Sequence, residues 1–391
     1  MKIAWLNEHF LQWNGGVKWI LEIGRRLKQQ CELDIFIAKA SDVNKHAFRQ
    51  AGIELQEFSN ISTDNSRYWL FYPYFIWENS RKLKRLLKFY DVVISTSPTT
   101  CVIAALLDHR SIFVFFEPNA WVYSPDFING LPFMQRLLLQ VGHPITKWLD
   151  QSAMKKADRL VTLDNLNAAR GRAIYGRQPE IIPVGVDTEL FSSKHHADLE
   201  TAYVDYQVII HSATYLSPVK GTRFIIEAMP KIIKRVPNCR LLILNPYNQE
   251  RERSEFMALA QSIGVASHIE FLPKLKEEDL PYYFSLARAV IQPSLYVSTH
   301  MPLVEGAACE TPAIAFDGIN ADEDIVDGET GFITPAGNID MLAQKTVELL
   351  QNPDLRAKMG RKARERAIKL FSWDHNADLM LNMAKEICNK A

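Results

Sequence analysis

The sequence has few cysteines, and no two of them stand in a C-x-x-C spacing. Five cysteines are scattered along 391 residues, and an odd, dispersed set fits neither a disulfide framework nor a zinc site. No segment reaches the roughly 20 apolar residues of a membrane-spanning helix, and the first residues lack the apolar core of a signal peptide. We therefore expect a cytoplasmic protein.

An excess of charge of either sign is also lacking. Lysine plus arginine and aspartate plus glutamate both number 45, and the pI is about 7.1. A balanced chain creates no long-range field that would attract nucleic acid or acidic lipid. We expect no nucleic-acid partner, and any charged ligand must be bound locally.

Short apolar, β-branched segments form two series, with helical patterns between their members. Such segments are typical of strands that are buried on both faces of a parallel sheet. The pattern predicts an α/β protein with two doubly wound, Rossmann-like domains. The first series lies at 2–6, 33–38, 91–97, 111–117 and 159–163, and the second at 207–213, 240–245, 268–272, 289–294 and 312–316.

A polar, poorly periodic segment at 186–203 separates the two series and indicates a linker. We place an N-terminal domain at 1–190, a hinge at 191–205 and a C-terminal domain at 206–371. The remaining residues, 372–391, are expected to form a helix that returns to the N-terminal domain. We expect the ligand-binding cleft at the hinge.

Two adjacent glycines, Gly15 and Gly16, follow the first predicted strand and precede an amphipathic helix at 18–28. Adjacent glycines let backbone N–H groups approach a phosphate at a helix N-terminus, where the partial positive charge lies. The spacing is not G-x-G-x-x-G, so the dinucleotide fingerprint is absent. A simple turn is the alternative interpretation.

Lys220 lies between the strand at 207–213 and a helical stretch that begins after Gly221. Ligands of doubly wound sheets bind at the carboxyl ends of the strands, where an ammonium could neutralise a diphosphate. The alternative is a solvated surface lysine.

A third candidate site is the segment 293–316, where a strand, a loop and a short helix rich in small residues follow one another. Pro302 suits the first turn of that helix, whose free amides at 299–303 would bind an anion. We expect Glu305 in the first turn, with its carboxylate accepting hydrogen bonds from two ribose hydroxyls. A carboxylate that only complements the helix dipole is the alternative.

Asp322 and Asp324 have a spacing that could hold a divalent cation, but they lie in a long acidic loop. A hard cation requires several converging oxygen ligands. We therefore expect no metal and no other cofactor.

The chain resembles the retaining GT-B glycosyltransferases of the glycosyl transferases group 1, which include glycogen synthase-like, lipopolysaccharide and mannosyl transferases. The resemblance spans nearly the whole chain and is carried by the stretches 157–191, 216–229 and 303–377. It implies two domains facing a central cleft, and transfer of a sugar from a nucleotide-sugar donor without a metal. A glycan, a lipid-linked molecule or a small molecule would be the acceptor.

The resemblance also implies roles for individual residues. Gly16 matches the glycine that faces the donor phosphates, Lys220 the lysine that stabilises the leaving diphosphate, and Glu305 the glutamate that holds the ribose. Leu275 falls where backbone groups meet the base. Lys220 and, on the acceptor side, Glu117 are the implied catalytic residues. The implied donor site comprises Gly15, Gly16, Lys220, Leu275, His300, Met301, Leu303, Val304 and Glu305.

Several positions depart from the family pattern. Val297 stands where a first glutamate is usual, Tyr215 where an arginine partners the lysine, and His300 where a glycine is usual. Phe116, before Glu117, replaces the acceptor-side histidine. Loss of the arginine removes positive charge from a diphosphate site. Loss of the glutamate removes an acceptor for sugar hydroxyls, which suggests a deoxy or otherwise less polar donor sugar.

Aromatic and basic residues are concentrated at 67–90 and 119–148. Such residues can stack on sugars, pack in cores or contact a membrane surface. In the last case we expect contact with the inner face of the membrane, where a lipid-linked acceptor would lie.

Two other classes of protein remain as alternatives. A nucleotide-sugar epimerase shares the two-domain architecture, but it needs acid and base groups around the sugar. Val297 and Tyr215 also fit a catalytically weakened partner subunit that binds a nucleotide sugar through Lys220 and Glu305 without turning it over.

Overall fold

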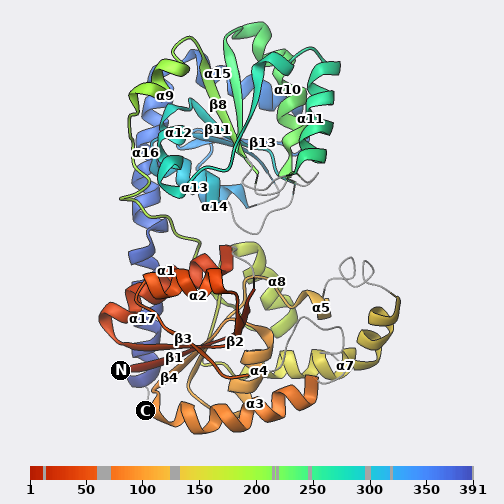
Figure 1. Cartoon of the computed structure of the whole chain (residues 1–391), viewed down its shortest axis with the longest axis vertical. Coiled ribbons are helices and arrows are strands. Elements are labelled where there is room, and N and C mark those ends of the chain that lie inside the picture. The colour runs from red at the N-terminus through yellow and green to blue at the C-terminus, as the bar shows by residue number, and fades with distance from the viewer. Residues whose placement is uncertain are drawn as a thin grey trace. The chain divides into compact units, whose positions relative to one another are not determined.

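The computed structural model describes residues 1–11, 15–59, 72–123, 133–213, 216, 220–244, 249–295, 301–317 and 320–389. The chain divides into two compact units (Figure 1). The first unit combines Met1–Pro183 with Trp373–Ala391, and the second is Val184–Ser372. Each contains one parallel sheet with helices on its faces, so the prediction of two Rossmann-like α/β domains is confirmed.

The sheet of the first unit has the strand order β3-β2-β1-β4-β5-β6-β7. The order reverses beside β1, which pairs with both β2 and β4, so that Trp5 lies opposite Ile35 on one side and Ile94 on the other. This reversal is where doubly wound sheets bind ligands. The strands are β1 (Lys2–Phe10), β2 (Glu32–Ala40), β3 (Leu55–Glu57), β4 (Val92–Ser95), β5 (Ser111–Val114), β6 (Arg159–Thr162) and β7 (Glu180–Ile181).

Three helices of the first unit, α2, α4 and α8, begin at side-chain caps. Ser41, Ser97 and Asp164 each accept a hydrogen bond from the backbone N–H three residues later, which satisfies one free donor of the helix. The helices are α1 (Gly15–Gln30), α2 (Asp42–Gln50), α3 (Tyr72–Leu86), the 3-10 turn η2 (Leu87–Phe89), α4 (Pro98–Leu106), α5 (Ala120–Tyr123), α7 (Phe133–Lys156), α8 (Asn165–Tyr175) and α17 (Trp373–Asn389).

The last helix, α17, packs against α1 although more than 340 residues separate them in the sequence. Asn376 donates a hydrogen bond to the carbonyl oxygen of Pro183 at 2.8 Å, and Trp19 of α1 donates to the same oxygen at 3.3 Å. Trp373 is buried. This helix therefore contributes to the core of the first unit.

The second unit contains a sheet with the order β10-β9-β8-β11-β12-β13. Here the order reverses beside β8, and Ile209 of β8 lies opposite Ala289 of β11. Apart from partly exposed Gln207, Ser212, Arg240, Glu270, Phe271 and Ile333, the strand residues are buried. The strands are β8 (Gln207–Ser212), β9 (Cys239–Leu244), β10 (Ile269–Leu272), β11 (Ala289–Gln292), β12 (Ala313–Phe316) and β13 (Gly331–Thr334).

Helices cover both faces of this sheet (Figure 1). They are α9 (Ala197–Ala202), α10 (Thr222–Arg235), α11 (Glu250–Ser262), the 3-10 turns η4 (Ala266–His268) and η5 (Glu277–Asp279), α12 (Leu280–Leu286), α13 (Met301–Ala308), α14 (Ala321–Asp324), α15 (Ile339–Gln351) and α16 (Pro353–Phe371). Throughout the described ranges of both units, each helix is too short or too polar to cross a bilayer.

The unit boundary differs from the expected hinge at 191–205. These residues belong to the second unit, where Phe191 is buried with its ring centroid 6.2 Å from that of Phe284. Val186 donates its N–H to the carbonyl oxygen of Phe371 at 2.6 Å. Most other side chains of the segment are exposed or partly exposed, so few of its positions need to be apolar. This exposure explains why its sequence is polar and aperiodic.

A buried carboxylate anchors α5, which follows the loop containing Glu117. Asp150 of α7 is 2% exposed, and its Oδ2 accepts a hydrogen bond from the hydroxyl of Tyr123 at 2.9 Å. Burial raises the pKa of Asp150 to about 6, although hydrogen bonds from Tyr123, Tyr175 and Asn119 oppose the increase. Burial also raises the pKa of Tyr123. The pKa of this carboxyl therefore lies well above that of an exposed aspartate.

Replacing Asp150 by asparagine should change how stability depends on pH. A carboxyl whose pKa rises on folding from 3.8 to about 6 holds its proton more tightly in the folded state, so stability falls as the pH rises between these values. From about pH 5 to about pH 7.5, the wild type should lose about 1 kcal/mol more unfolding free energy than Asp150→Asn. Urea unfolding at both pH values measures this difference, and parallel changes in the two proteins would contradict it.

Candidate donor site

Lys220 and Glu305 follow neighbouring strands of the second unit. Lys220 lies two residues before α10, in the connection from β8, and Glu305 lies on α13, in the connection from β11. Because β8 and β11 are parallel partners at the point where the strand order reverses, both connections begin at the edge of the sheet where ligands bind. The structure therefore brings together the second and third candidate sites of the sequence analysis.

The backbone of the Lys220 turn is held against the end of β11. Ser294 donates its hydroxyl to the carbonyl oxygen of Lys220 at 3.2 Å, and the side-chain amide of Gln292 donates to that hydroxyl at 3.0 Å. Gly221 has a φ of +78°, and a Cβ there would lie 1.8 Å from the carbonyl oxygen of Pro293. Both the left-handed backbone and the close approach require glycine.

A buried histidine, His211, connects the same two strands beneath this turn. Its Nδ1 lies 2.8 Å from the carbonyl oxygen of Ile291, and its Nε2 lies 3.0 Å from the hydroxyl oxygen of Thr222. Since a carbonyl only accepts, Nδ1 carries the proton and neutral Nε2 accepts from Thr222. Burial lowers the pKa of His211 to about 4, and the nearby charge of Lys220 also lowers it. The histidine is therefore a neutral structural bridge near neutral pH.

His211 is not among the residues predicted from the sequence. The sequence offers one signal for it, a histidine directly after the apolar residues Val208, Ile209 and Ile210 of the predicted strand at 207–213. A polar side chain at a fully buried position requires hydrogen-bond partners, and those partners lie 11 and 80 residues away. The partners, Ile291 on β11 and Thr222 at the start of α10, are therefore known only from the folded structure.

Lys220 itself is partly buried, and the loss of hydration lowers the pKa of its ammonium group. Among the residues that the structure describes, no acidic side chain forms an ion pair with it. Partial burial weakens screening by water, so an anionic ligand would gain more from this ammonium than from one in bulk solvent.

Glu305 lies on a helix that is fixed closely to the sheet. It is 8% exposed, and at the next residue, Gly306, a Cβ would lie 2.5 Å from Cγ2 of Val290. Arg364 of α16 donates hydrogen bonds to the carbonyl oxygens of Ala308 and, at 3.2 Å, Phe191. These contacts hold both the face and the carboxyl end of α13 in place.

The expectation that Glu305 lies in the first helical turn was wrong. The helix α13 begins at Met301, so Glu305 is its fifth residue, and the first turn contains no acidic side chain. The free N–H groups of a helix belong to its first four residues. Dipole complementation in that turn therefore does not explain the glutamate.

The positions of the other predicted donor residues do not test their predicted roles. Leu303 and Val304 are buried, and their side chains pack in the core of the second unit. Met301 begins α13, and Leu275 is partly buried against the same core. His300, Val297 and Tyr215 lie outside the described residues.

Candidates in the first unit lie near two strand ends of its sheet. Gly15 and Gly16 begin α1, which follows β1 at the reversal of strand order. Glu117 is exposed in the loop after β5. Phe116 packs edge-on against Trp19 of α1, with ring centroids 5.6 Å apart. The aromatic side chain thus has a packing role.

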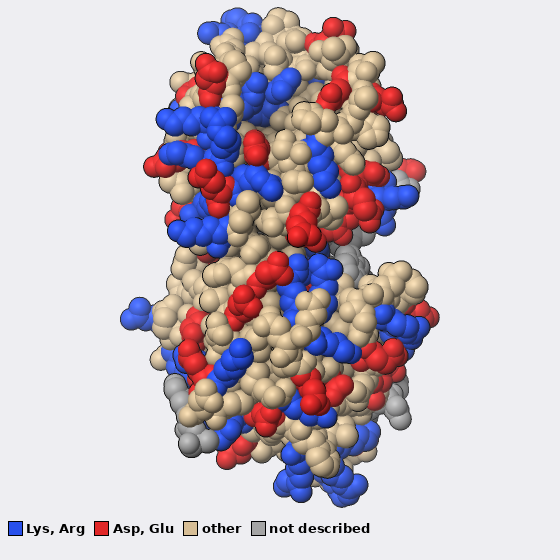
Figure 2. Space-filling view, turned by 90° about the vertical axis from the view of Figure 1, so that its left-hand side faces the viewer, with Lys and Arg blue, Asp and Glu red and all other residues tan. Residues whose placement is uncertain are grey.

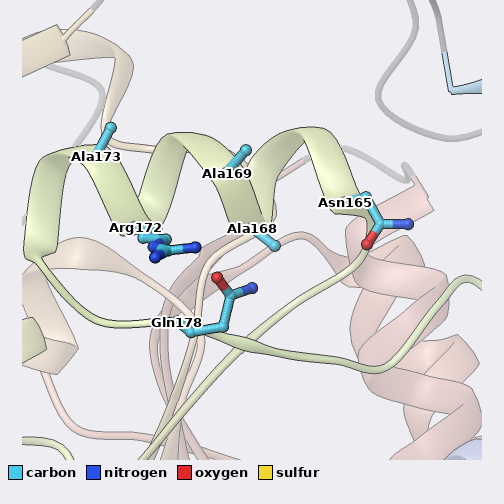
Figure 3. A pocket seen from close by; sticks show the side chains of 6 residues that line it. All are labelled: Asn165, Ala168, Ala169, Arg172, Ala173 and Gln178. Atoms are coloured by element: carbon cyan, nitrogen blue, oxygen red, sulfur yellow. The ribbon is translucent and has the colours of Figure 1, made fainter.

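A hollow of about 570 Å³ lies elsewhere on the first unit, beside α8. In Figure 3, the side chains of Arg172 and Gln178 approach each other below the helix. The hollow contains none of the predicted donor or acceptor residues, so it is separate from the candidate site. Its lining residues are Asn165, Ala168, Ala169, Arg172, Ala173 and Gln178.

Acidic residues do not form a recognisable metal centre in the parts of the chain that the structure describes. No group of three or more histidine, cysteine, aspartate or glutamate side chains there could hold an ion. Asp322 and Asp324 lie on the short helix α14.

Two family models match the chain. Residues 13–190 match Glycosyltransferase Family 4, and residues 200–366 match Glycosyl transferases group 1. Together the matches include both glycines of the first candidate site, Lys220 and Glu305.

The chain spans from 52% to 75% of the length of the curated relatives that it matches. The chain is 26% identical over 244 residues to the D-inositol 3-phosphate glycosyltransferase of Gordonia bronchialis, covering 60% of this chain and 53% of the relative. It is 27% identical over 231 residues to the GDP-mannose-dependent alpha-(1-6)-phosphatidylinositol monomannoside mannosyltransferase of Mycolicibacterium smegmatis, covering 56% of this chain and 59% of that protein.

The fold matches that of solved GT-B glycosyltransferases. HepE from Anabaena, crystallised in complex with UDP, is 16% identical and gives a TM-score of 0.79, with 99% of this chain and 100% of HepE covered. At this identity the likeness shows the shared fold alone.

Gly221→Ala tests whether the Lys220 turn depends on its close contact with Pro293. The added Cβ would strain the backbone and collide with the carbonyl oxygen, so we expect a loss of about 3 kcal/mol or more of unfolding free energy. Gly264→Ala is the matched control, because its φ is +73° and no atom lies within 4 Å of its Cβ position. The control should lose only about 1 kcal/mol. Equal losses in urea unfolding would contradict the contact.

Proposed function

Because the chain belongs to the glycosyltransferases described by these two family models, we propose that it transfers a sugar from a nucleoside-diphosphate sugar to an acceptor. The observation that carries this proposal is the partly buried ammonium of Lys220, which has no acidic ion-pair partner among the described residues. It lies beside the strand-order reversal, close in the topology to the helix of Glu305.

Lys220 would stabilise the leaving diphosphate. As the bond between the anomeric carbon and the phosphate oxygen breaks, negative charge accumulates on the diphosphate, and a positioned cation lowers the energy of that state. The tight packing of Gly221 and the hydrogen bond from Ser294 would hold the cation in place before reaction. We propose that this ammonium acts without a divalent metal.

Glu305 would hold the ribose. Its burial and the rigid attachment of α13 suit a carboxylate that accepts hydrogen bonds from two neighbouring hydroxyls. The relative from Mycolicibacterium smegmatis is named for GDP-mannose, and the solved HepE structure contains UDP. These different nucleotides support a nucleoside diphosphate as the common element and leave the base open.

The reaction would retain the anomeric configuration. The acceptor hydroxyl would attack from the side on which the diphosphate departs, its oxygen would bond to the anomeric carbon, and its proton would pass to the diphosphate. Positioning and charge stabilisation would then supply most of the catalysis. Product formed with the opposite configuration, read by proton NMR, would exclude this route.

The acceptor side is proposed to involve the first unit, with Glu117 as its candidate residue. Exposure of Glu117 after β5 supports a role in contacting an acceptor. The two curated relatives are named for an inositol phosphate and for a phosphatidylinositol mannoside, which support a polyol, glycan or lipid-linked acceptor.

A catalytically weakened partner subunit is the second candidate function. Tyr215 and Val297 favour it, because they replace groups that normally assist donor chemistry. A weakened subunit would bind the nucleoside diphosphate normally and would transfer no sugar from any donor. Turnover of deoxyhexose donors in preference to plain hexoses would instead support an altered donor specificity.

Lys220→Ala should weaken the binding of nucleoside diphosphates by about tenfold or more, because a partly desolvated charge contact is removed. Calorimetric titration with UDP and GDP, with and without Mg²⁺, measures this change. Lys234→Ala is the matched control, since Lys234 is exposed in the last turn of the same helix, α10. Unchanged affinity in Lys220→Ala, or binding that requires Mg²⁺, would contradict the proposed phosphate site.

A further inference from the structure

Helix α3 of the first unit exposes large aromatic side chains while its opposite face is already packed. Tyr74 is 53% exposed and Trp77 is 54% exposed, and Phe89 in the adjoining turn η2 is 74% exposed. Phe75 and Leu83, on the other face of the helix, are completely buried. The exposed rings therefore do not serve the core of the unit, and aromatic side chains gathered in solvent commonly mark an interaction surface.

The same surface is strongly basic. The segment 74–89 contains five basic residues and one acidic residue, whereas the whole chain has a formal net charge of zero. The acidic residue, Glu78, forms an ion pair with Lys82 at 2.9 Å. Figure 2 shows lysine and arginine side chains gathered at the end of the first unit where α3 lies in Figure 1. The basic residues are Arg81, Lys82, Lys84, Arg85 and Lys88, and all are exposed.

Helical spacing places the aromatic and basic side chains on one stripe. Tyr74, Trp77, Arg81, Lys84 and Lys88 follow one another at intervals of three or four residues, which align along one side of a helix. The guanidinium of Arg81 lies 4.9 Å from the ring centroid of Trp77, so the two kinds of side chain are in contact. The stripe, which we call the α3 stripe, is thus aromatic at one end and cationic at the other.

A second exposed group lies on the same side of the sheet. Helices α3, α4 and α7 precede β4, β5 and β6, which are consecutive in the sheet, and right-handed crossovers place such helices on one face. On α7, Ile145 and Trp148 are 63% and 65% exposed, and Lys147 between them is also exposed. The chemistry of the α3 stripe therefore recurs on this face.

We propose that the α3 stripe binds the surface of a bilayer that contains anionic lipid. Tryptophan and tyrosine favour the boundary between water and acyl chains, and lysine and arginine extend their charged ends to anionic headgroups while their aliphatic stems remain in that boundary. This combination fits lipid better than a nucleic acid or an acidic protein, neither of which provides an apolar layer beneath the charges. The inference rests on the proposed function in that it gives the acceptor a source at the membrane surface.

Vesicle co-sedimentation of the full chain tests this surface. Vesicles of phosphatidylcholine mixed with phosphatidylglycerol should bind the wild type, and vesicles of phosphatidylcholine alone should bind it much less. The double variant Lys84→Glu/Arg85→Glu should lower the partition into mixed vesicles by about tenfold or more, because two attractive charges become repulsive. Trp77→Ala should lower it also at high salt, where charge attraction is screened.

A matched double variant controls for general charge effects. Lys234→Glu/Arg235→Glu makes the same change in the last turn of α10, where both residues are exposed, and it should leave vesicle binding unchanged. Equal losses in the two double variants, or equal binding of the wild type to both kinds of vesicle, would overturn the inference.

Nucleotide binding separates this inference from the proposed function. The variant Lys84→Glu/Arg85→Glu should bind UDP or GDP with wild-type affinity, which also shows that it is folded. Vesicle binding by a wild type that binds no nucleoside diphosphate would overturn the proposed function and support the membrane surface. Nucleotide binding without any vesicle binding would overturn the membrane surface and support the proposed function.

Discussion

Parallel pairing of β8 with β11 is the constraint on which the candidate donor site depends. The pairing brings the turn at Lys220 against Ser294, although 74 residues separate them in the sequence. It also gives His211 its acceptor on Ile291. Gly221 is required because the chain passes so close to Pro293 that no side chain fits. The position of the ammonium is therefore set by the sheet rather than by its own loop.

Burial has different consequences at the charged groups of this protein. Lys220 is only partly buried, and the loss of hydration lowers the pKa of its ammonium group. His211 is fully buried, so it stays neutral near pH 7 and serves as a hydrogen-bond bridge. Asp150 is buried beside Tyr123, and its raised pKa reflects the cost of a charge in that position. Of these three groups, Lys220 combines partial burial with a position at the strand-order reversal.

The first unit combines a doubly wound sheet with an exposed surface that is both aromatic and basic. Its sheet reverses order beside β1, as the second sheet does beside β8. On α3, however, the exposed side carries rings and bases while the inner side supplies Phe75 and Leu83 to the core. In the sequence, the exposed and the buried side chains of α3 form one aromatic, basic segment, because residues of the two helix faces alternate every three or four positions. Burial separates them.

The sequence by itself determined the two α/β domains, since β-branched strands and amphipathic helices have local patterns that survive without a partner. It also predicted Lys220 and Glu305 as donor-site residues, because each follows a strand in a local order typical of ligand-binding turns, and their roles stay a prediction. Tertiary structure decided the rest. The segment 191–205 belongs to the second unit, because Phe191 is buried in its core. Glu305 lies beyond the first turn of α13. The hydrogen-bond partners of His211 are likewise known only from the structure. Burial and pairing between distant strands are not encoded in neighbouring residues, so these outcomes required the folded chain.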